Sequence, residues 1–477
     1  APGKSRKPLG WVAIFGLLGS MAATLMQHHQ VTYVGGTFTG FYNTVQIDGF
    51  SIFFHLLIAS VAAVVLLASL DYFAPEHGVT HAGEYFALVC FGSVGMMLMT
   101  CSIELLMVFI GLEISSISTY ILAGFRKGRA GASEASLKYF LLGSFATAFF
   151  LYGIALTYGA TGSTAIGPIA AKLAVGSPAP GLAILAVAMV LIGMGFKVSA
   201  APFHVWTPDV YQGAPSPVIA LMSTGPKAAA FAVLLRFLFN GTPMLRSHWT
   251  PMIAVLAVLS MTIGNLGALL QKDVKRMLAY SSIAHAGYLL VAFTAIQTEA
   301  VSGVLFYAAA YTAMNAGAML VVTLLSGFNE PLLTIEDFTG VALKKPYLAA
   351  LMGVFMISLI GIPFTGGFFG KFYIFTGAIH NGYVWLAVVG LANSGVACFY
   401  YLRFLVALYS RPVAATPEPV AKLSIPAAIA VTVAAVAVLA LGIFPNRILH
   451  MAQSATPYTT TPAAVALPPI ATTTAPQ

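Results

Sequence analysis

The stretch from Gly181 to His204 reads GLAILAVAMVLIGMGFKVSAAPFH, and a second apolar stretch, STGPKAAAF, lies at Ser223 to Phe231. Each stretch carries one lysine, Lys197 or Lys227, within an apolar run long enough to cross a bilayer. A lysine at the centre of a membrane helix costs about 2.5–3.5 kcal/mol, and such residues face a protein interior or a water-filled path. Desolvation also favours the neutral form of an amine, which makes proton release near neutral pH accessible. The two lysines therefore predict a membrane protein that handles protons.

Composition points to the same class of protein. Hydrophobic residues make up 59% of the 477 residues and charged residues 8%, whereas soluble domains have about 45–50% and about 25%. The formal net charge of +8 does not indicate nucleic-acid binding, because the basic residues fall in short connections and form no stripe interleaved with aromatic residues. The three cysteines form no C-x-x-C pair, so we expect neither a disulfide framework nor an iron–sulfur site.

Thirteen apolar runs have a length suitable for membrane-spanning helices. They cover residues 8–26, 49–70, 84–99, 105–124, 137–159, 181–213, 217–239, 250–270, 277–296, 301–325, 347–379, 383–409 and 424–444. The sequence therefore predicts an all-α polytopic membrane protein with about thirteen transmembrane helices.

Lysine and arginine are distributed unevenly over the connections, and cytoplasmic loops are enriched in both. One set of alternate connections contains Lys4, Arg6, Lys7, Arg126, Lys127, Arg129, Lys272, Lys275, Arg276, Lys344, Lys345, Arg403, Arg411 and Lys422. The opposite set contains Lys172, Arg246 and Arg447. We expect the first set on the cytoplasmic side, which places the N-terminus of this chain inside and its C-terminus in the periplasm.

Two of the runs are too long for straight helices. The runs 181–213 and 347–379 each have 33 residues, which would rise about 50 Å across a hydrocarbon core of about 30 Å. Pro202 interrupts the first, and the sequence GIPFTGGFFGK, which ends at Lys371, interrupts the second. Irregular backbone at membrane depth lies against protein or lines a cavity, so both breaks indicate an internal polar path. A simple kink in the core is the alternative.

The spacing of the runs indicates an internal repeat. Starts at 84, 137, 181 and 217 recur at 250, 301, 347 and 383, an offset of about 166 residues, with 105 and 277 as a looser fifth pair. Five spans are an odd number, so the second unit is expected to be inverted relative to the first, with one broken helix in each. The predicted organisation is N-terminal helices at 1–83, five-helix units at 84–240 and 250–410, a C-terminal helix within 411–455 and a disordered tail at 456–477.

Glu113 adds a carboxylate in the middle of a span. An ionised carboxylate there requires a cation, and Lys197 is the candidate partner. At about 4 Å and an effective dielectric constant near 20 their attraction is worth roughly 4 kcal/mol, enough to keep both charged until a nearby charge changes. The pair is expected to be switchable, and a static ion pair that locks two helices is the alternative.

Four further residues are weaker candidates. His285 is near mid-span, either as a proton relay between Lys227 and Lys371 or as a core histidine with satisfied hydrogen bonds. Lys138 is expected to be buried and is a possible member of the path. Glu104 lies on the opposite helix face from Glu113 at the edge of its span, where helix capping is favoured over a place on the path. His204 lies beside the first break.

Nucleotide-binding motifs are absent from the sequence. No G-x-G-x-x-G follows a strand pattern, and no G-x-x-x-x-G-K-[ST] occurs. We therefore expect this chain itself to bind no NADH, flavin or ATP.

Three long motifs carry a resemblance to a known family. They are GFKVSAAPFHVWTPDVYQGAPSP (195–217), DVKRMLAYSSIAHAGY (273–288) and GIPFTGGFFGKFY (361–373). Over nearly the whole chain the sequence resembles the antiporter-like membrane subunits of respiratory complex I, and among these subunit N of bacterial proton-translocating NADH-quinone oxidoreductases. The resemblance implies a proton-translocating subunit of the bacterial inner membrane without a prosthetic group. FMN, iron–sulfur clusters and quinone are expected in partner subunits.

The resemblance also implies roles for individual residues. Glu113 and Lys197 become the coupling ion pair, Lys227 the central proton-carrying lysine, His285 a relay and Lys371 the terminal lysine near the exit. The middle antiporter-like subunit tends to carry glutamate where this chain has Lys371, and the distal subunit continues into a long amphipathic helix that this C-terminus does not predict. The implied neighbours are therefore the middle antiporter-like subunit and the small membrane subunits. Bacterial members usually have fourteen spans, so the thirteen here are expected to match their second to fourteenth.

Three functions remain open on the sequence alone. The first is a redox-driven proton pump subunit of complex I. The second is a subunit of a multisubunit cation/proton antiporter, or of a complex I relative fed by ferredoxin or hydrogenase modules. The third is a membrane scaffold whose charges only lock helices together.

Overall fold

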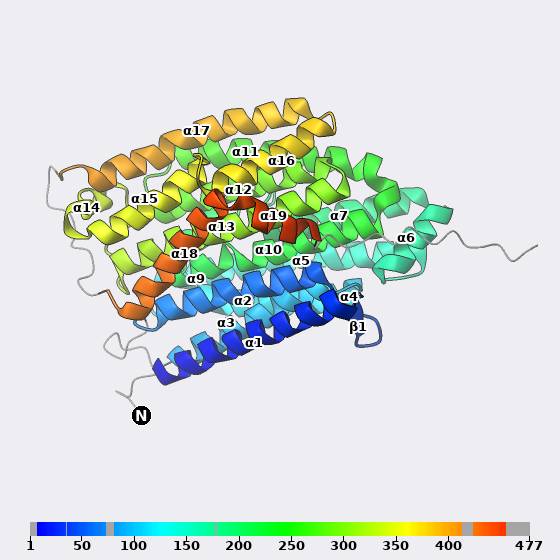
Figure 1. The fold of residues 1–477 in the computed structure, drawn as a ribbon, viewed down its shortest axis with the longest axis horizontal. Coiled ribbons are helices and arrows are strands. Elements are labelled where there is room, and N and C mark those ends of the chain that lie inside the picture. The colour runs from blue at the N-terminus through cyan, green and yellow to red at the C-terminus, as the bar shows by residue number, and fades with distance from the viewer. Residues whose placement is uncertain (1–6, 35, 73–80, 177–178, 413–422, 455–477) are drawn as a thin grey trace, which may run out of the picture.

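The structure, a computed structural model, describes residues 7–34, 36–72, 81–176, 179–412 and 423–454. The tail 456–477, predicted to be disordered, lies outside the described residues. The described part is almost entirely helical and contains one hairpin of two short antiparallel strands, β1 (Phe38–Gly40) and β2 (Val45–Ile47). The long helices lie side by side along the long axis of the molecule in Figure 1.

Within the described residues, twelve helical segments are long and apolar enough to cross a membrane. Nine are single helices: α1 (Lys7–Val34), α2 (Gly49–Ser69), α3 (Ala82–Cys101), α4 (Leu105–Ala123), α5 (Ala130–Thr161), α7 (Pro180–Val198), α13 (Gln297–Ser326), α17 (Val384–Tyr409) and α18 (Ile425–Ile443). The other three are built from consecutive helices: α9 (Ser216–Met222) with α10 (Gly225–Leu235) and η2 (Arg236–Gly241), η3 (Pro243–Leu245) with α11 (Arg246–Leu269), and α12 (Val274–Val291) with η4 (Ala292–Thr294). The remaining elements are α6 (Ile166–Val175), α8 (Thr207–Gly213), η5 (Glu336–Phe338), α14 (Val341–Lys344), α15 (Pro346–Ile360), α16 (Gly366–His380) and α19 (Pro445–Ser454).

One of the thirteen predicted runs, 347–379, is not among these twelve segments. It corresponds to α15 and α16 together. Neither helix is long enough to cross a membrane alone, because the backbone leaves the helical conformation at Gly361 and resumes it at Gly366. Gly361 has a φ of +93°, a left-handed conformation that favours glycine. The break expected in the run 347–379 is therefore present, and it lies at the predicted glycines.

The run 181–213 is also broken as predicted. Helix α7 ends at Val198, and α8 begins only at Thr207, so that Pro202 lies in the irregular segment between them. The structure contains one break that we did not predict, within the run 217–239. There α9 ends at Met222 and α10 begins at Gly225, directly before Lys227.

Two rings of five helical segments share the same packing order. In the first ring α3 contacts α4, α4 contacts α5, α5 contacts α7, α7 contacts α10 and α10 contacts α3. In the second ring the corresponding contacts join α11 to α12, α12 to α13, α13 to α15, α15 to α17 and α17 to α11. The recurrence supports the predicted division into two five-helix units. An odd number of crossings brings the chain to the opposite face before the second unit starts.

Burial separates the central helices from those at the periphery. The most apolar windows of Ser216–Gly241 and Val274–Thr294 are 100% and 94% buried, whereas that of α1 is 22% buried. In Figure 1, α1 and α17 form opposite edges of the molecule. Large apolar side chains such as Leu391 are exposed on this periphery, which suits contact with lipid or neighbouring membrane subunits. The two most buried segments carry Lys227 and His285.

The C-terminal region is more structured than predicted. Helix α18 packs against α2, α13 and α16, and a further short helix, α19, follows it at Pro445–Ser454 and lies against α13. We predicted only one helix within 411–455. The residues after the last apolar span are rich in Pro, Thr and Ala and show no sustained apolar stripe of helical period, so α19 was not predicted.

Candidate functional site

Lys197 lies in the last turn of α7, where Ser199 ends the helix in a left-handed conformation. Its side chain is buried, and Nζ donates a hydrogen bond to Ser116 Oγ on α4 at 2.9 Å. The rings of Tyr120 and Tyr139 lie 6.0 and 5.8 Å from Nζ. These aromatic faces and one hydroxyl form a small polar site in an apolar wall, as the lysine requires.

Glu113 lies one helical turn before Ser116 on α4. It is the charged group that acts on Lys197 through space. Its Oε1 atom is buried and has no hydrogen-bond partner within the described protein. The direct Glu113–Lys197 ion pair that we expected is not formed. The Lys197 ammonium group donates to Ser116 Oγ instead, and Glu113 acts on it at longer range.

Lys227 lies in the first turn of α10, directly after the unpredicted break. Its Nζ donates to the backbone carbonyl of Ser282 at 3.1 Å and to Ser282 Oγ at 2.5 Å. Ser282 Oγ also accepts a hydrogen bond from the hydroxyl of Tyr311 at 2.6 Å. The N-terminal end of a helix carries partial positive charge, which opposes a cation at this position. The helix end therefore destabilises the positive charge of Lys227.

His285 follows Ser282 by three residues on the same face of α12. Its Nδ1 lies 2.6 Å from the hydroxyl of Tyr307, and its Nε2 lies 3.2 Å from the hydroxyl of Tyr401. Tyr401 is also hydrogen-bonded to Ser281. A ring with a hydroxyl on each nitrogen can receive a proton at one side and release one at the other. The same contacts also satisfy the histidine, so the geometry fits both interpretations of the sequence.

Lys371 lies on α16, opposite the broken end of α15. Its Nζ donates to the carbonyls of Leu359 and Ile360 at 3.1 and 2.9 Å and to Ser394 Oγ at 2.8 Å. The Tyr288 ring lies 4.8 Å from Nζ. Carbonyls at the end of a helix lack intrahelical partners and favour a nearby cation. The break in this span thus creates the acceptors that hold Lys371.

The weaker candidates lie elsewhere. Lys138 is not buried as expected: its side chain is 41% exposed and pairs with Glu134 and Asp209, both at 2.7 Å. It lines an open cavity of about 310 Å³ between α5, α8 and the start of α12. Glu104 caps α4, because its carboxylate accepts a hydrogen bond from the Met107 amide at 2.7 Å, as favoured from the sequence. His204 lies between α7 and α8, and its Nδ1 is buried without a hydrogen-bond partner among the described groups.

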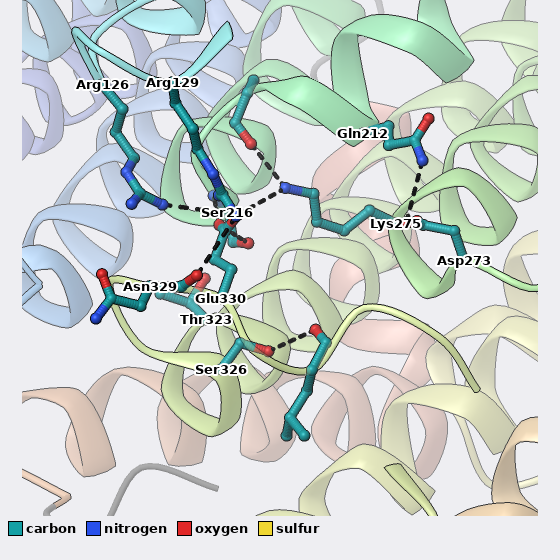
Figure 2. Close-up of polar contacts among 12 residues, drawn as sticks. Arg126, Arg129, Gln212, Ser216, Asp273, Lys275, Thr323, Ser326, Asn329 and Glu330 are labelled. Carbon is teal, nitrogen blue, oxygen red and sulfur yellow. Dashed lines mark hydrogen bonds and ion pairs between the residues drawn. The ribbon is translucent and has the colours of Figure 1, made fainter. Parts of the chain in front are cut away.

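Sequence analysis missed a buried carboxylate, Glu330, that joins distant segments (Figure 2). Glu330 accepts hydrogen bonds from Arg129 at 2.5 Å, Lys275 at 3.2 Å and both the amide and hydroxyl of Ser216 at 3.1 and 2.7 Å. Arg126 lies 3.9 Å away. Burial alone would raise the pKa of Glu330, but Lys275, the Ser216 hydrogen bonds and Arg129 lower it to about 2.

Lys275 is placed differently from our expectation, and Arg236 was not among the candidate residues. Lys275 was assigned to a basic connection, but it is buried and also donates to the Ala214 carbonyl at 2.8 Å. Arg236 is buried and pairs with Asp48 at 2.8 Å. Arg236 lies within the apolar run 217–239, so the criterion that found Lys227 also applies to it. No such signal marked Glu330, because its partners are far away in sequence.

Among the described residues, no group of three or more histidine, cysteine, aspartate or glutamate side chains is arranged to hold a metal ion. The groups that contact Lys197, Lys227, His285 and Lys371 are hydroxyls and backbone carbonyls. Such groups can bind and pass protons.

Two rings of membrane helices with a buried lysine at each break define an antiporter-like membrane subunit. The family model described as "NADH:quinone oxidoreductase/Mrp antiporter, TM" matches residues 102–397, and the chain belongs to this family. It is 51% identical over 449 residues to a protein of Koribacter versatilis called NADH-quinone oxidoreductase subunit N 2, which covers 94% of this chain and 90% of that protein.

Two of the solved structures with the same fold come from respiratory membrane complexes. A chain of respiratory complex I from Thermus thermophilus matches with a TM-score of 0.79 and 37% identity, over 94% of each chain. A chain of the membrane-bound sulfane sulfur reductase, an archaeal respiratory membrane complex, matches with a TM-score of 0.82 and 26% identity, over 95% of this chain and 92% of that one.

Proposed function

We propose that this chain is the proton-translocating membrane subunit N of an NADH-quinone oxidoreductase. The observation that carries this proposal is the row of buried basic side chains, Lys197, Lys227, His285 and Lys371, each with hydroxyl or carbonyl partners inside the protein. Charged groups that only lock helices together would be expected to pair with opposite charges, as Arg236 pairs with Asp48. The four basic residues pair instead with neutral groups that can pass protons.

The Glu113–Lys197 pair is the proposed switch. Because no direct ion pair forms, the two groups interact through space without its rigidity. Such an interaction is worth roughly 4 kcal/mol at about 4 Å and less at longer range. A change of charge in a neighbouring subunit can therefore shift Lys197 towards or away from Glu113, and the altered field then acts on Lys227.

Transfer from Lys227 to Lys371 is proposed to follow the central hydroxyls. Ser282 and Tyr311 contact each other beside Lys227, and the Tyr311 ring lies 5.2 Å from the His285 ring. His285 then contacts Tyr307 and Tyr401. Lys227 lies at a helix N-terminus, which opposes its charge, whereas Lys371 faces helix-end carbonyls, which support it. This difference favours movement of a proton from Lys227 towards Lys371.

Redox chemistry is proposed to take place outside this chain. As a subunit of an enzyme complex, the chain would contribute proton transfer, and FMN, iron–sulfur clusters and quinone would be held by partner subunits. The proposed location is the bacterial inner membrane, with the end carrying Arg126, Arg129 and Lys275 in the cytoplasm and the C-terminus in the periplasm. The excess of basic residues at that end supports this orientation.

The proposed neighbours are the middle antiporter-like subunit and the small membrane subunits on the quinone side. Lys371, where the middle subunit tends to carry glutamate, supports this position.

Copurification and transport assays test the proposal against an antiporter function. The tagged chain is expected to copurify from native membranes with NADH- and quinone-binding subunits, and NADH oxidation by that complex in proteoliposomes is expected to drive proton uptake. Crosslinks from this chain should reach the middle antiporter-like subunit and the small membrane subunits. Copurification with small antiporter subunits alone, together with proton exchange driven by a sodium gradient, would overturn the proposal.

A further inference from the structure

The row of polar contacts has a gap between Lys197 and Lys227. Lys197 contacts Ser116, and Lys227 contacts Ser282, but no hydrogen bond between described residues joins the two pairs. Two buried tyrosines lie in the interval, Tyr139 on α5 and Tyr211 on the short helix α8.

The hydroxyl of Tyr211 has three polar neighbours: Ser282 is close enough to act on it as a hydrogen-bonding group, and Tyr139 and Tyr311 act on it through space. In the described part of the protein, the Tyr211 oxygen is nevertheless buried without a hydrogen-bond partner. An unpaired buried hydroxyl costs about 1–3 kcal/mol, and phenylalanine would fill the same space without this cost. The hydroxyl therefore requires an explanation other than packing.

Ring contacts and hydroxyl groups connect Tyr211 with Lys197. The Tyr139 ring lies 5.8 Å from Lys197 Nζ and stacks on Trp206 at 4.4 Å, and Trp206 meets the Tyr211 ring edge-on at 6.3 Å. Thr119, which follows Ser116 by three residues on α4, is the hydrogen-bond partner of the Tyr139 hydroxyl. Hydroxyl groups thus continue from Lys197 towards Tyr211.

Polar contacts also fix the position of α8. Asp209 pairs with Lys138 and Arg276, each at 2.7 Å. The segment that follows α8 is held against Glu330, because Lys275 donates to the Ala214 carbonyl and Ser216 donates to the Glu330 carboxylate. Figure 2 shows these contacts together with Gln212 of α8. The Tyr211 side chain is therefore presented from a fixed helix, and its hydroxyl can change partner by rotation of the O–H bond and small shifts of the ring.

We propose that the hydroxyl of Tyr211 passes protons between Lys197 and Lys227. This inference rests on the proposed function and names a further residue for it. Lys197 gives up a proton through the hydroxyls of Ser116, Thr119 and Tyr139. Tyr211 then accepts a proton from Tyr139 and gives its own to Ser282, and the Ser282 proton passes to the neutral amine of Lys227. Each oxygen gains one proton and loses one, so one proton moves from Lys197 to Lys227 and no electron is transferred.

The variant Tyr211→Phe in the assembled complex tests the proposal. It removes one oxygen that has no partner, so the amount of complex should equal that of the wild type and its thermal stability should be no lower. Protons pumped per NADH should fall to the level of Lys227→Ala. Where residual pumping persists, its solvent deuterium isotope effect should exceed that of the wild type, because proton transfer across the gap has become slower.

Tyr85→Phe is the matched control. Tyr85 is another fully buried tyrosine, and its hydroxyl contacts Ser69 far from the lysines, so its removal should leave pumping and the isotope effect unchanged. Wild-type pumping in Tyr211→Phe would overturn the proposal. Loss of pumping that only follows loss of complex, with an unchanged isotope effect, would assign a structural role and overturn it as well. Normal pumping in Lys227→Ala would instead count against the proposed function itself.

Discussion

Replacement of Glu330 by glutamine is expected to destabilise the folded chain by about 3 kcal/mol. Lys275, the hydrogen bonds from Ser216 and Arg129 outweigh burial and hold the pKa of Glu330 at about 2, below its ordinary value of 4.5. At about 1.36 kcal/mol per pKa unit this difference corresponds to roughly 3 kcal/mol. Removal of one member of a buried ion cluster costs about 3–5 kcal/mol, because it leaves the opposite charges unpaired.

The stabilisation by Glu330 should also depend on pH. Its folded-state pKa lies below the unfolded-state value, so its contribution is complete above about pH 4.5 and is lost as the pH falls towards about 2. The wild type should therefore lose its advantage over Glu330→Gln in this window. Elsewhere in the same loop, Glu336 is exposed, and Glu336→Gln should change the stability by less than about 0.5 kcal/mol.

Pulse proteolysis at increasing urea concentration measures these differences in the purified complex held in lipid nanodiscs. The urea midpoint for cleavage of this chain should be lower for Glu330→Gln than for wild type and Glu336→Gln at pH 7. Equal midpoints for all three proteins would refute the reasoning, because a carboxylate among three cations would then contribute nothing to stability.

Two further predictions concern function. Glu113→Ala should lower quinone reduction and proton translocation with the amount of assembled complex largely unchanged, because Glu113 has no structural partner on its Oε1 atom; activities normalised to assembled complex check this, and unaltered pumping would remove Glu113 from the switch. The purified chain alone should oxidise no NADH and show no visible absorbance band, and a flavin or haem that copurifies stoichiometrically would contradict this.

Most of the fold follows from local sequence signals. Apolar runs predicted the spans, and Pro202 and the glycines near 361–367 predicted two breaks, because these residues act on their own backbone. The break before Lys227 was missed, since Gly225 and Pro226 stand in an otherwise uninterrupted apolar run. Gly225 is required there because a Cβ atom would approach the Met96 sulfur to 2.7 Å. That contact comes from a distant helix and is invisible in the run itself.

The candidate site was predictable to the level of single residues but not of pairs. The cost of a charge at membrane depth identified Lys197, Lys227 and Lys371 one at a time. The partners are mostly serines, tyrosines and backbone carbonyls, which occur throughout the sequence and carry no signal of their own. For the same reason a direct Glu113–Lys197 pair was expected where Lys197 instead donates to Ser116.

The proton-to-electron ratio of Lys227→Ala tests most directly whether protons pass along the buried lysines. The assembled complex is reconstituted in proteoliposomes, and proton uptake is measured for each NADH oxidised. Lys172→Ala is the control, because Lys172 is an exposed lysine on α6. We predict a lower ratio for Lys227→Ala and the wild-type ratio for Lys172→Ala, at equal amounts of assembled complex. A wild-type ratio in Lys227→Ala would contradict a path through this lysine.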